Sequence, residues 1–257
     1  MNGSFRSDGL VLARHLAVPA GRAGKGPLPA LVMCHGFPVG PLDARRSAGT
    51  FPELMDRIAN EMGFAAMTFT FRGCGQSSGD FSLAGWVSDL RNAIEHLRSE
   101  VDTDGLFLVG TSTGGSLSVC VAAQDARVTG VAMLSARAGF EDWAAQPRRF
   151  LDHAREIGAI RHPAFPPSFD VWARELRSFK PVESARRLAP RPLLVLHGED
   201  DDSVPARDAR RLALAHGSAM LRIIPGAGHR LRHDPRAVAI LLGWLDRQRN
   251  ALAPAET

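Results

Sequence analysis

Short apolar segments alternate along the chain with longer segments in which apolar residues recur every three or four positions. Six apolar segments begin near residues 30, 65, 105, 128, 192 and 219, and most of them end in a glycine-containing turn. Segments that are apolar at nearly every position are typical of parallel strands covered on both faces. The alternation predicts an α/β protein with a doubly wound, mostly parallel sheet flanked by helices.

Two of the helices are indicated most clearly by the pattern. One apolar stripe at spacings of three and four predicts a helix over about residues 82–100. The last helix is expected to begin after Asp234, which is a suitable N-cap, with Pro235 at its first position. The stripe of the first helix comprises Leu83, Trp86, Val87, Leu90, Ile94 and Leu97.

Two segments depart from this alternation. The first 18 residues alternate weakly around Asp8 and Gly9, which predicts a β-hairpin at a sheet edge. Residues 137–190 contain aromatic clusters and several prolines but no clear strand. We expect them to form a small helical insertion over the carboxyl edge of the sheet, either a lid or a structural excursion that packs on the domain. The remaining pattern is continuous, so residues 1–257 are expected to form a single domain.

Composition excludes several classes of protein. The chain is 45% hydrophobic and 23% charged, as is typical of a soluble globular protein. The net charge is +4, but arginines alternate with acidic residues and form no concentrated basic patch, so no nucleic-acid partner is expected. The N-terminus does not resemble a signal peptide, and no apolar run reaches the ~18 residues of a membrane span. A cytoplasmic protein without a membrane partner is therefore expected.

The cysteines indicate neither a disulfide framework nor a zinc cluster. Cys34, Cys74 and Cys120 are an odd number with no C-x-x-C spacing. Reduced, buried thiols are expected, and no metal site is predicted.

Two stretches fit the pattern G-x-S-x-G, which marks a nucleophilic serine when a buried strand runs directly into a helix. GTSTG at 110–114 follows the apolar segment LFLV and is followed at once by GGSLSVCVAAQ, which has small and apolar residues at helical positions. GQSSG at 75–79 lies in a glycine-rich stretch that continues as a loop. Ser112 is therefore predicted to be the nucleophile, and Ser77 to lie in a turn.

A nucleophilic serine requires a base and usually a carboxylate that orients the base. The apolar segment PLLVLHG is followed by EDDDSVP, which contains three consecutive aspartates. The last apolar segment ends in GAGH, which places His229 in a glycine-rich turn. The chain order Ser, Asp, His is the one associated with this type of turn. His229 is the predicted base, and the residues alone leave Asp200, Asp201 and Asp202 as candidates for the acid.

Five motifs follow one another along the chain: HGF at 35–37, FRGCGQSSG at 71–79, GTSTGG at 110–115, HGEDDDSVP at 197–205 and GAGH at 226–229. Together they resemble the motifs of the α/β-hydrolase superfamily, and the likeness is to small bacterial-type esterases of the feruloyl esterase-like and dienelactone hydrolase-like kinds. The resemblance implies the α/β-hydrolase fold and selects Asp201, three residues after Gly198 and three before Val204, with Asp200 and Asp202 as alternatives.

The same resemblance bears on three further motif residues. His35 and His197 resemble structural histidines rather than the base. The family usually has an acidic residue before the arginine of the second motif, but Thr70 and Phe71 precede Arg72 here. The charge pairing that this arginine has elsewhere in the family therefore does not carry over to Arg72 from the motif.

The resemblance implies a serine hydrolase that cleaves a small-molecule carboxylic ester through an acyl-enzyme, without a metal or an organic cofactor. The amides of Phe37 and Thr113 are the expected oxyanion donors. A peptidase or amidase, a thioesterase or acyltransferase, and a ligand-binding protein without activity are the alternatives.

The walls of the substrate pocket are predicted only from position and size. If the insertion covers the site, the aromatic walls are expected to comprise Phe37, Trp143, Phe150, Phe165 and Trp172. Arg45, Arg46 and Arg148 are either solvated surface residues or contacts for an acidic substrate.

Overall fold

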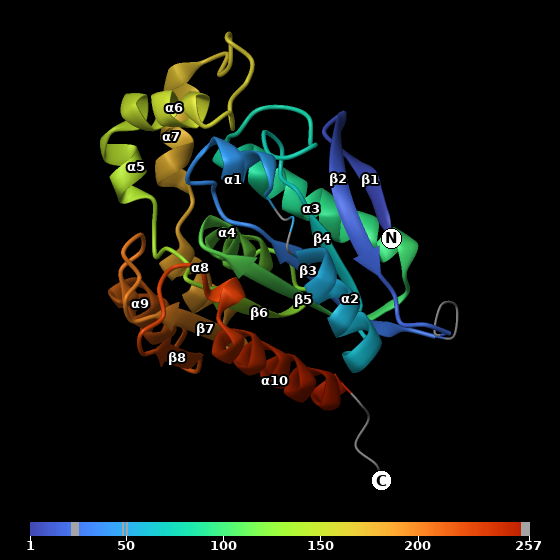
Figure 1. The fold of residues 1–257 in the computed structure, drawn as a ribbon. Helices are drawn as coiled ribbons and strands as arrows, with labels where there is room; N and C mark the ends of the chain where they lie inside the picture. The colour runs from blue at the N-terminus through green and yellow to red at the C-terminus, as the bar shows by residue number, and fades with distance from the viewer. Residues whose placement is uncertain (22–25, 48, 50, 253–257) are drawn as a thin grey trace.

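The computed structural model describes residues 1–21, 26–47, 49 and 51–252. The other positions of the predicted domain 1–257 lie outside the described residues. The described chain forms one eight-stranded sheet in the order β1-β2-β4-β3-β5-β6-β7-β8, with helices on both faces (Figure 1). The strands are β1 Asn2–Ser7, β2 Leu10–Ala17, β3 Leu28–Cys34, β4 Ala65–Phe69, β5 Thr103–Thr111, β6 Val128–Leu134, β7 Leu193–Gly198 and β8 Met220–Ile224.

The sheet is parallel from β4 through β3 to β8, and this confirms the predicted fold class. The two N-terminal strands are antiparallel to each other, and β2 is antiparallel to β4. The turn of this hairpin is formed by Asp8 and Gly9, both with positive φ, as the sequence predicted. Its outer strand β1 ends the sheet at one edge.

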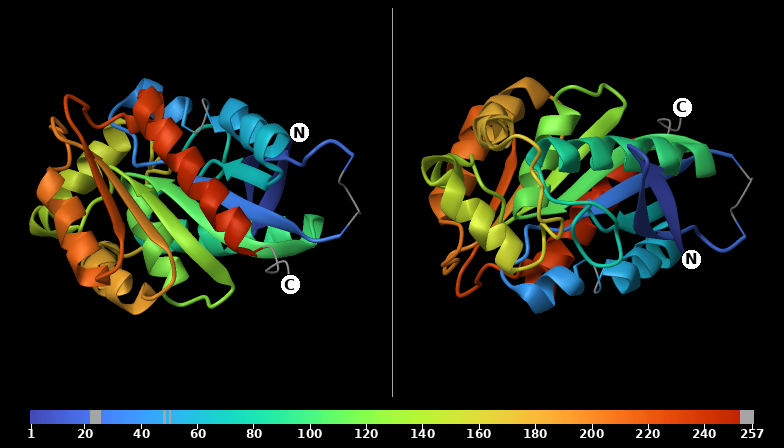
Figure 2. Two further views of the ribbon diagram at one scale, coloured as in Figure 1. Left: turned by 90° about the horizontal axis from the view of Figure 1, so that it is seen from below. Right: turned by 90° about the horizontal axis from the view of Figure 1, so that it is seen from above.

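The sheet separates two apolar layers, and each layer is covered by its own set of helices. Side chains of α3, α4, α8 and α9 pack on one face of the sheet, and those of α2 and α10 pack on the other (Figure 2). Within the described residues, no helix combines the length and the hydrophobicity that crossing a lipid bilayer requires. The helices are α1 Pro41–Arg45, α2 Phe51–Met62, α3 Leu83–Glu100, α4 Thr113–Ala122, α5 Glu141–Ala145, α6 Pro147–Glu156, α7 Phe169–Ser178, α8 Pro181–Leu188, α9 Ala206–His216, the 3₁₀ turn η1 Leu231–His233, and α10 Pro235–Leu252.

Side-chain caps define where the two best-predicted helices begin. The Ser82 hydroxyl accepts a hydrogen bond from the Gly85 amide at 3.0 Å and caps α3. Asp234 accepts one from the Arg236 amide at 2.8 Å, directly before α10. Such caps satisfy amides that have no acceptor within the helix.

Residues 137–190 contain α5, α6, α7 and α8. Helix α8 packs against α4 and α9 and therefore belongs to a layer that flanks the sheet. Helices α5, α6 and α7 lie outside that layer, beyond the sheet (Figure 1). We refer to residues 141–178, which contain these three helices, as the outer segment.

Arg72 connects the N-terminal hairpin to α3. Its Nη2 atom lies 2.7 Å from Oδ1 of Asp89 and 2.7 Å from Oδ2 of Asp8. Asp89 is fully buried and also accepts hydrogen bonds from the Arg72 amide and the Ser7 hydroxyl. The acidic partner missing beside Arg72 in the sequence is therefore supplied by α3 and by the hairpin turn.

The three cysteines are buried, and none of them forms a disulfide within the described chain. Burial raises the pKa of the Cys34 and Cys74 thiols to about 12 and that of Cys120 to about 11. Thiols with such pKa values remain protonated and chemically inert at neutral pH.

Candidate active site

Ser112 is the single residue between the end of β5 and the start of α4. Its φ of 49° and ψ of −123° are strained for a residue with a side chain. The glycines around it allow the tight approach of backbone that this turn requires. A Cβ on Gly110 would lie 2.4 Å from the Gly115 amide nitrogen, and one on Gly114 would lie 2.3 Å from the His35 carbonyl oxygen. A side chain at either position would clash with the backbone, so GTSTG requires glycine at 110 and 114.

Ser77, in the second G-x-S-x-G match, has a different environment. It is completely buried, and its hydroxyl donates a hydrogen bond to the Thr70 carbonyl at 2.5 Å. The same oxygen accepts a hydrogen bond from the Ala13 amide at 3.0 Å. Ser77 therefore links the loop after β4 to β2 and does not line the cavity that contains Ser112.

Asp201 follows β7 and is hydrogen-bonded to His229. Its Oδ2 atom lies 2.8 Å from Nδ1 of His229, and its Oδ1 atom accepts hydrogen bonds from the Ser203 and Val204 amides at 3.0 and 2.8 Å. Asp200 and Asp202, the two alternatives, are exposed on the same turn.

The environment of Asp201 favours its ionised form. Burial alone would raise the pKa of this carboxyl, but hydrogen bonds from His197, His229 and the Val204 amide outweigh burial. Together they hold the pKa well below its ordinary value. The carboxylate is therefore ionised at neutral pH and can stabilise a protonated His229.

His197 is a second imidazole beside the same carboxylate. Its Nε2 atom lies 2.8 Å from the Val204 carbonyl oxygen and 3.2 Å from Oδ2 of Asp201. A carbonyl oxygen only accepts, so Nε2 carries the proton and donates to both oxygens. The Nδ1 atom is buried without a partner among the described residues. These two contacts link His197 to both the loop and the carboxylate of Asp201.

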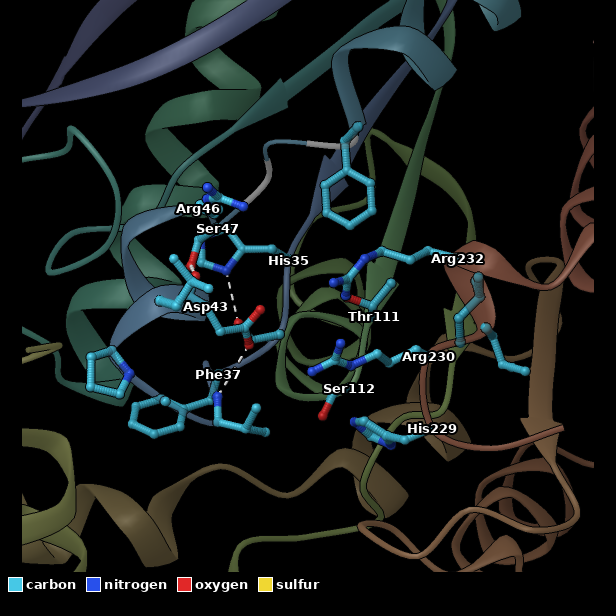
Figure 3. A pocket seen from close by; sticks show the side chains of 18 residues that line it. His35, Phe37, Asp43, Arg46, Ser47, Thr111, Ser112, His229, Arg230 and Arg232 are labelled. Carbon is cyan, nitrogen blue, oxygen red and sulfur yellow. Dashed lines mark hydrogen bonds between the residues drawn. The ribbon is translucent and has the colours of Figure 1, made fainter. Parts of the chain in front are cut away.

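Ser112 and His229 line one cavity of about 460 Å³. Figure 3 shows the hydroxyl and the imidazole next to each other on one side of it. The hydrogen bond of His229 within the described structure is made to Asp201. Among the described residues, no hydrogen bond joins the Ser112 hydroxyl to His229. Contacts between a nucleophile and its base commonly tighten when substrate binds.

The two expected oxyanion donors approach the nucleophile from different elements. Thr113 is the first residue of α4, so its amide has no acceptor within the helix. Phe37 follows β3 and lines the cavity. A Cβ on Gly36 would lie 2.9 Å from Cβ of Ser112, which shows how closely the loop of Phe37 approaches the serine.

His35 fixes this loop from inside the core. Its Nε2 atom accepts a hydrogen bond from the Phe71 amide at 3.0 Å, and its Nδ1 atom donates one to the Gly36 carbonyl at 2.8 Å. Burial lowers the pKa of His35 to about 4, so the ring is neutral and this donor and acceptor pattern is kept at physiological pH.

Of the five aromatic residues expected to form the pocket wall, Phe37 lines the cavity, whereas Trp143, Phe150, Phe165 and Trp172 do not line it and pack in the core. Trp143 and Phe150 are stacked, with ring centroids 4.1 Å apart, and both lie against Phe37 at 5.3 and 5.2 Å. Trp172 is buried and donates a hydrogen bond to the Phe81 carbonyl at 3.2 Å. Phe165 packs on the edge of the same core.

Two further short segments supply much of the cavity wall. One is residues 39–47, around α1, and the other is residues 230–232, directly after His229. Of the three arginines considered from the sequence as contacts for an acidic substrate, Arg46 lines the cavity, and Arg45 and Arg148 do not. The second segment carries Arg230 and Arg232. Their position directly after the predicted base is the signal in the sequence from which they could have been found.

Comparison with known proteins identifies the family. Residues 31–241 match the model of the alpha/beta hydrolase family. The chain belongs to this family. An uncharacterised protein of Mycobacterium tuberculosis is 32% identical over 179 residues, which cover 68% of this chain and 55% of that protein. Esterase LipC of the same organism is 26% identical over 200 residues, covering 65% of this chain and 48% of the esterase. The chain thus spans about half the length of these curated relatives.

A solved structure of the same architecture is Est1E from Butyrivibrio proteoclasticus. It superposes with a TM-score of 0.72 at 16% identity and covers 98% of each chain. At this identity the likeness concerns the fold, and it agrees with the parallel sheet and flanking helices described above.

Proposed function

We propose that the protein is a serine hydrolase that cleaves small carboxylic esters through an acyl-enzyme. The observation that carries the proposal is the 2.8 Å hydrogen bond between Asp201 and Nδ1 of His229, with His229 lining the same cavity as Ser112. Family membership and the likeness to esterase LipC support the reaction class.

In the first half-reaction, Oγ of Ser112 attacks the ester carbonyl carbon while Nε2 of His229 takes the hydroxyl proton. The hydrogen bond of Nδ1 to Asp201 leaves Nε2 free for this role. The tetrahedral intermediate carries its negative charge on the former carbonyl oxygen, where the amides of Phe37 and Thr113 would each stabilise it by roughly 3 kcal/mol. Collapse breaks the bond to the alcohol oxygen, which receives the proton from His229.

In the second half-reaction, water replaces the alcohol. His229 takes one proton of the water as its oxygen attacks the acyl carbon, and the second tetrahedral intermediate uses the same two amides. Its collapse returns the proton to Oγ of Ser112 and releases the carboxylic acid. Each step is completed by groups of this chain and by water.

A fluorophosphonate probe, which labels activated serines, tests the assignment. The wild-type protein and a Ser77→Ala variant should be labelled, and Ser112→Ala should not. Ser77 is the matched control because it fits the same sequence pattern in a different environment. Hydrolysis of p-nitrophenyl butyrate should fall on the order of 10⁶-fold in Ser112→Ala. Labelling that persists in folded Ser112→Ala, or a wild-type protein that is not labelled, would refute the proposal.

The class of acyl bond is tested separately. Among matched p-nitrophenyl esters, anilides and acyl thioesters, we expect the ester to be hydrolysed fastest. If an anilide or a thioester were hydrolysed faster and its hydrolysis also depended on Ser112, Ser112 would remain the nucleophile. The enzyme would then be an amidase or a thioesterase.

A further inference from the structure

The cavity that contains Ser112 is lined by more positive than negative charge. Arg46, Arg230 and Arg232 contribute to its wall, whereas Asp43 is the one carboxylate among the described lining residues. None of these three guanidinium groups forms an ion pair with a carboxylate of the described chain, although many other arginines do. The lining thus has an excess of two positive charges with no protein counter-ion.

Arg232 is the most confined of the three. Its Nε atom is buried and has no hydrogen-bond partner among the described residues, and its guanidinium carbon lies 5.9 Å from the centre of the Phe51 ring. Burial lowers the pKa of Arg232, although an arginine remains protonated at neutral pH. A partly desolvated cation without a counter-ion is unfavourable, and an anionic ligand would relieve this cost.

Asp43 does not neutralise this group by direct contact. Its Oδ2 atom accepts a hydrogen bond from the Val39 amide at 3.1 Å, and its influence on Arg232 is a longer-range attraction. Figure 3 shows Asp43 across the cavity from Arg230 and Arg232.

The arginines and the predicted base belong to one segment. Arg230 is the next residue after His229, and Arg232 is the second residue of η1. In Figure 3 both guanidinium groups extend from this segment into the space above Ser112. A substrate whose carbonyl carbon is at Ser112 would therefore present its distal part to these cations. The exposed apolar side chains of Val39 and Leu42 line the same cavity and suit an aliphatic spacer.

We propose that the preferred substrates are esters that carry a second, free carboxylate beyond an aliphatic spacer, such as half-esters of dicarboxylic acids. Arg232 binds the carboxylate and Arg230 assists it, because a planar guanidinium group donates two parallel hydrogen bonds to a carboxylate. This inference rests on the proposed function, since it assigns the substrate class of the same site.

Two esters that differ only in charge test the inference. p-Nitrophenyl hemiglutarate carries a free carboxylate, and p-nitrophenyl 5-methylhexanoate has an isopropyl group of the same shape in its place. After subtraction of the uncatalysed rates, kcat/KM for the charged ester should exceed that for the neutral one by about 10- to 100-fold, the range expected for hydrogen bonds to a charged group. A ratio near one in the wild-type protein would overturn the inference.

Variants locate the effect. Arg232→Gln and the double variant Arg230→Gln/Arg232→Gln should lower this ratio progressively, mainly through a higher KM for the charged ester. The control Arg207→Gln/Arg210→Gln removes the same charge from exposed positions of α9, outside the cavity, and should keep the wild-type ratio. Melting temperatures verify that all variants fold. An unchanged ratio in a folded Arg230→Gln/Arg232→Gln protein would overturn the inference.

Binding to Ser112→Ala separates this inference from the proposed function. Calorimetric titration with glutaric acid monoanilide and with 5-methylhexananilide should show tighter binding of the charged anilide, and the difference should be lost with Arg232→Gln. That result supports the inference even if the wild-type protein hydrolyses neither ester, in which case only the proposed function fails. Equal binding of both anilides, together with Ser112-dependent hydrolysis, would overturn the inference and leave the proposed function intact.

Discussion

The Nε2–H group of His197 is shared between the Val204 carbonyl oxygen, 2.8 Å away, and Oδ2 of Asp201, 3.2 Å away. The same carboxylate oxygen lies 2.8 Å from Nδ1 of His229. The acid therefore has an imidazole on either side: His229 lines the cavity, and His197 is completely buried.

Removal of this buried donor should impair turnover. We expect His197→Phe to lower kcat about tenfold with a smaller change in KM, because Asp201 loses a hydrogen bond that holds it in place. With one donor fewer, the carboxylate accepts more strongly from His229, so the acid limb of the kcat/KM profile should shift to higher pH. His197→Gln retains a donor and should restore part of both properties. An unaltered pH profile in a folded His197→Phe protein would assign the side chain a packing role only.

A methyl group on Gly36 should disturb the oxyanion site. Its Cβ would lie 2.9 Å from Cβ of Ser112 and 3.2 Å from the Thr111 carbonyl oxygen, so the loop that carries Phe37 must move. Loss of one oxyanion donor costs about 10²- to 10³-fold in kcat, and we expect Gly36→Ala to approach this value in steady-state kinetics. Gly40→Ala is the matched comparison in the same loop, because its Cβ would meet no atom within 4 Å. Equal losses in both variants would contradict the steric argument.

Burial of His35 should make stability depend on pH. The folded-state pKa of about 4 lies below the ordinary value of 6.5, so between these values the unfolded chain binds a proton that the folded chain does not. This contribution is fully present above about pH 6.5 and is lost as the pH falls to about 4, and its full size is about 3 kcal/mol.

Urea unfolding at pH 7, 6, 5 and 4 checks this dependence. The wild-type free energy of unfolding should decrease more steeply toward pH 4 than that of His35→Gln, which keeps an acceptor for the Phe71 amide but does not titrate. Parallel curves for the two proteins would show that other groups cause the pH dependence.

The ion pair between Arg72 and Asp89 should contribute more to stability than the pair with Asp8. The Asp89 side chain is fully buried, whereas that of Asp8 is 48% exposed. We expect Asp89→Asn to lower the free energy of unfolding by about 3–5 kcal/mol, since it leaves a buried charge without its main partner. Asp8→Asn should cost roughly 0–1 kcal/mol. Chemical denaturation of both variants gives the comparison, and similar costs would contradict the role assigned to burial.

The sequence predicted the features that depend on local pattern. The six apolar segments correspond to β3 through β8, and the expected helix starts near Ser82 and Asp234 coincide with observed caps. These predictions succeed because periodicity and capping are properties of neighbouring residues. The roles assigned to Ser112, Asp201 and His229 stay predictions about chemistry, although the structure brings the three residues to one region.

Features that depend on which distant segments meet were not predicted. The partners of Arg72 are on α3 and in the hairpin turn, and no spacing rule connects them. Apolar burial is not directional, so the composition of residues 137–190 did not reveal whether its aromatic rings would face a substrate or one another. The cationic wall formed by Arg230 and Arg232 was also not predicted, because it depends on how the segment after His229 lies relative to residues 39–47.

Two stacked rings of the outer segment, Trp143 and Phe150, pack against Phe37, whose amide is a proposed donor to the oxyanion. In the proposed hydrolase, α5 and α6 would brace the backbone that binds the oxyanion, and the opposite wall would select the ligand. Exchanging the outer segment for that of a relative should alter how fast bound esters react more than which esters are accepted. The proposed site would then allow speed and selectivity to be changed through different sides of the same cavity.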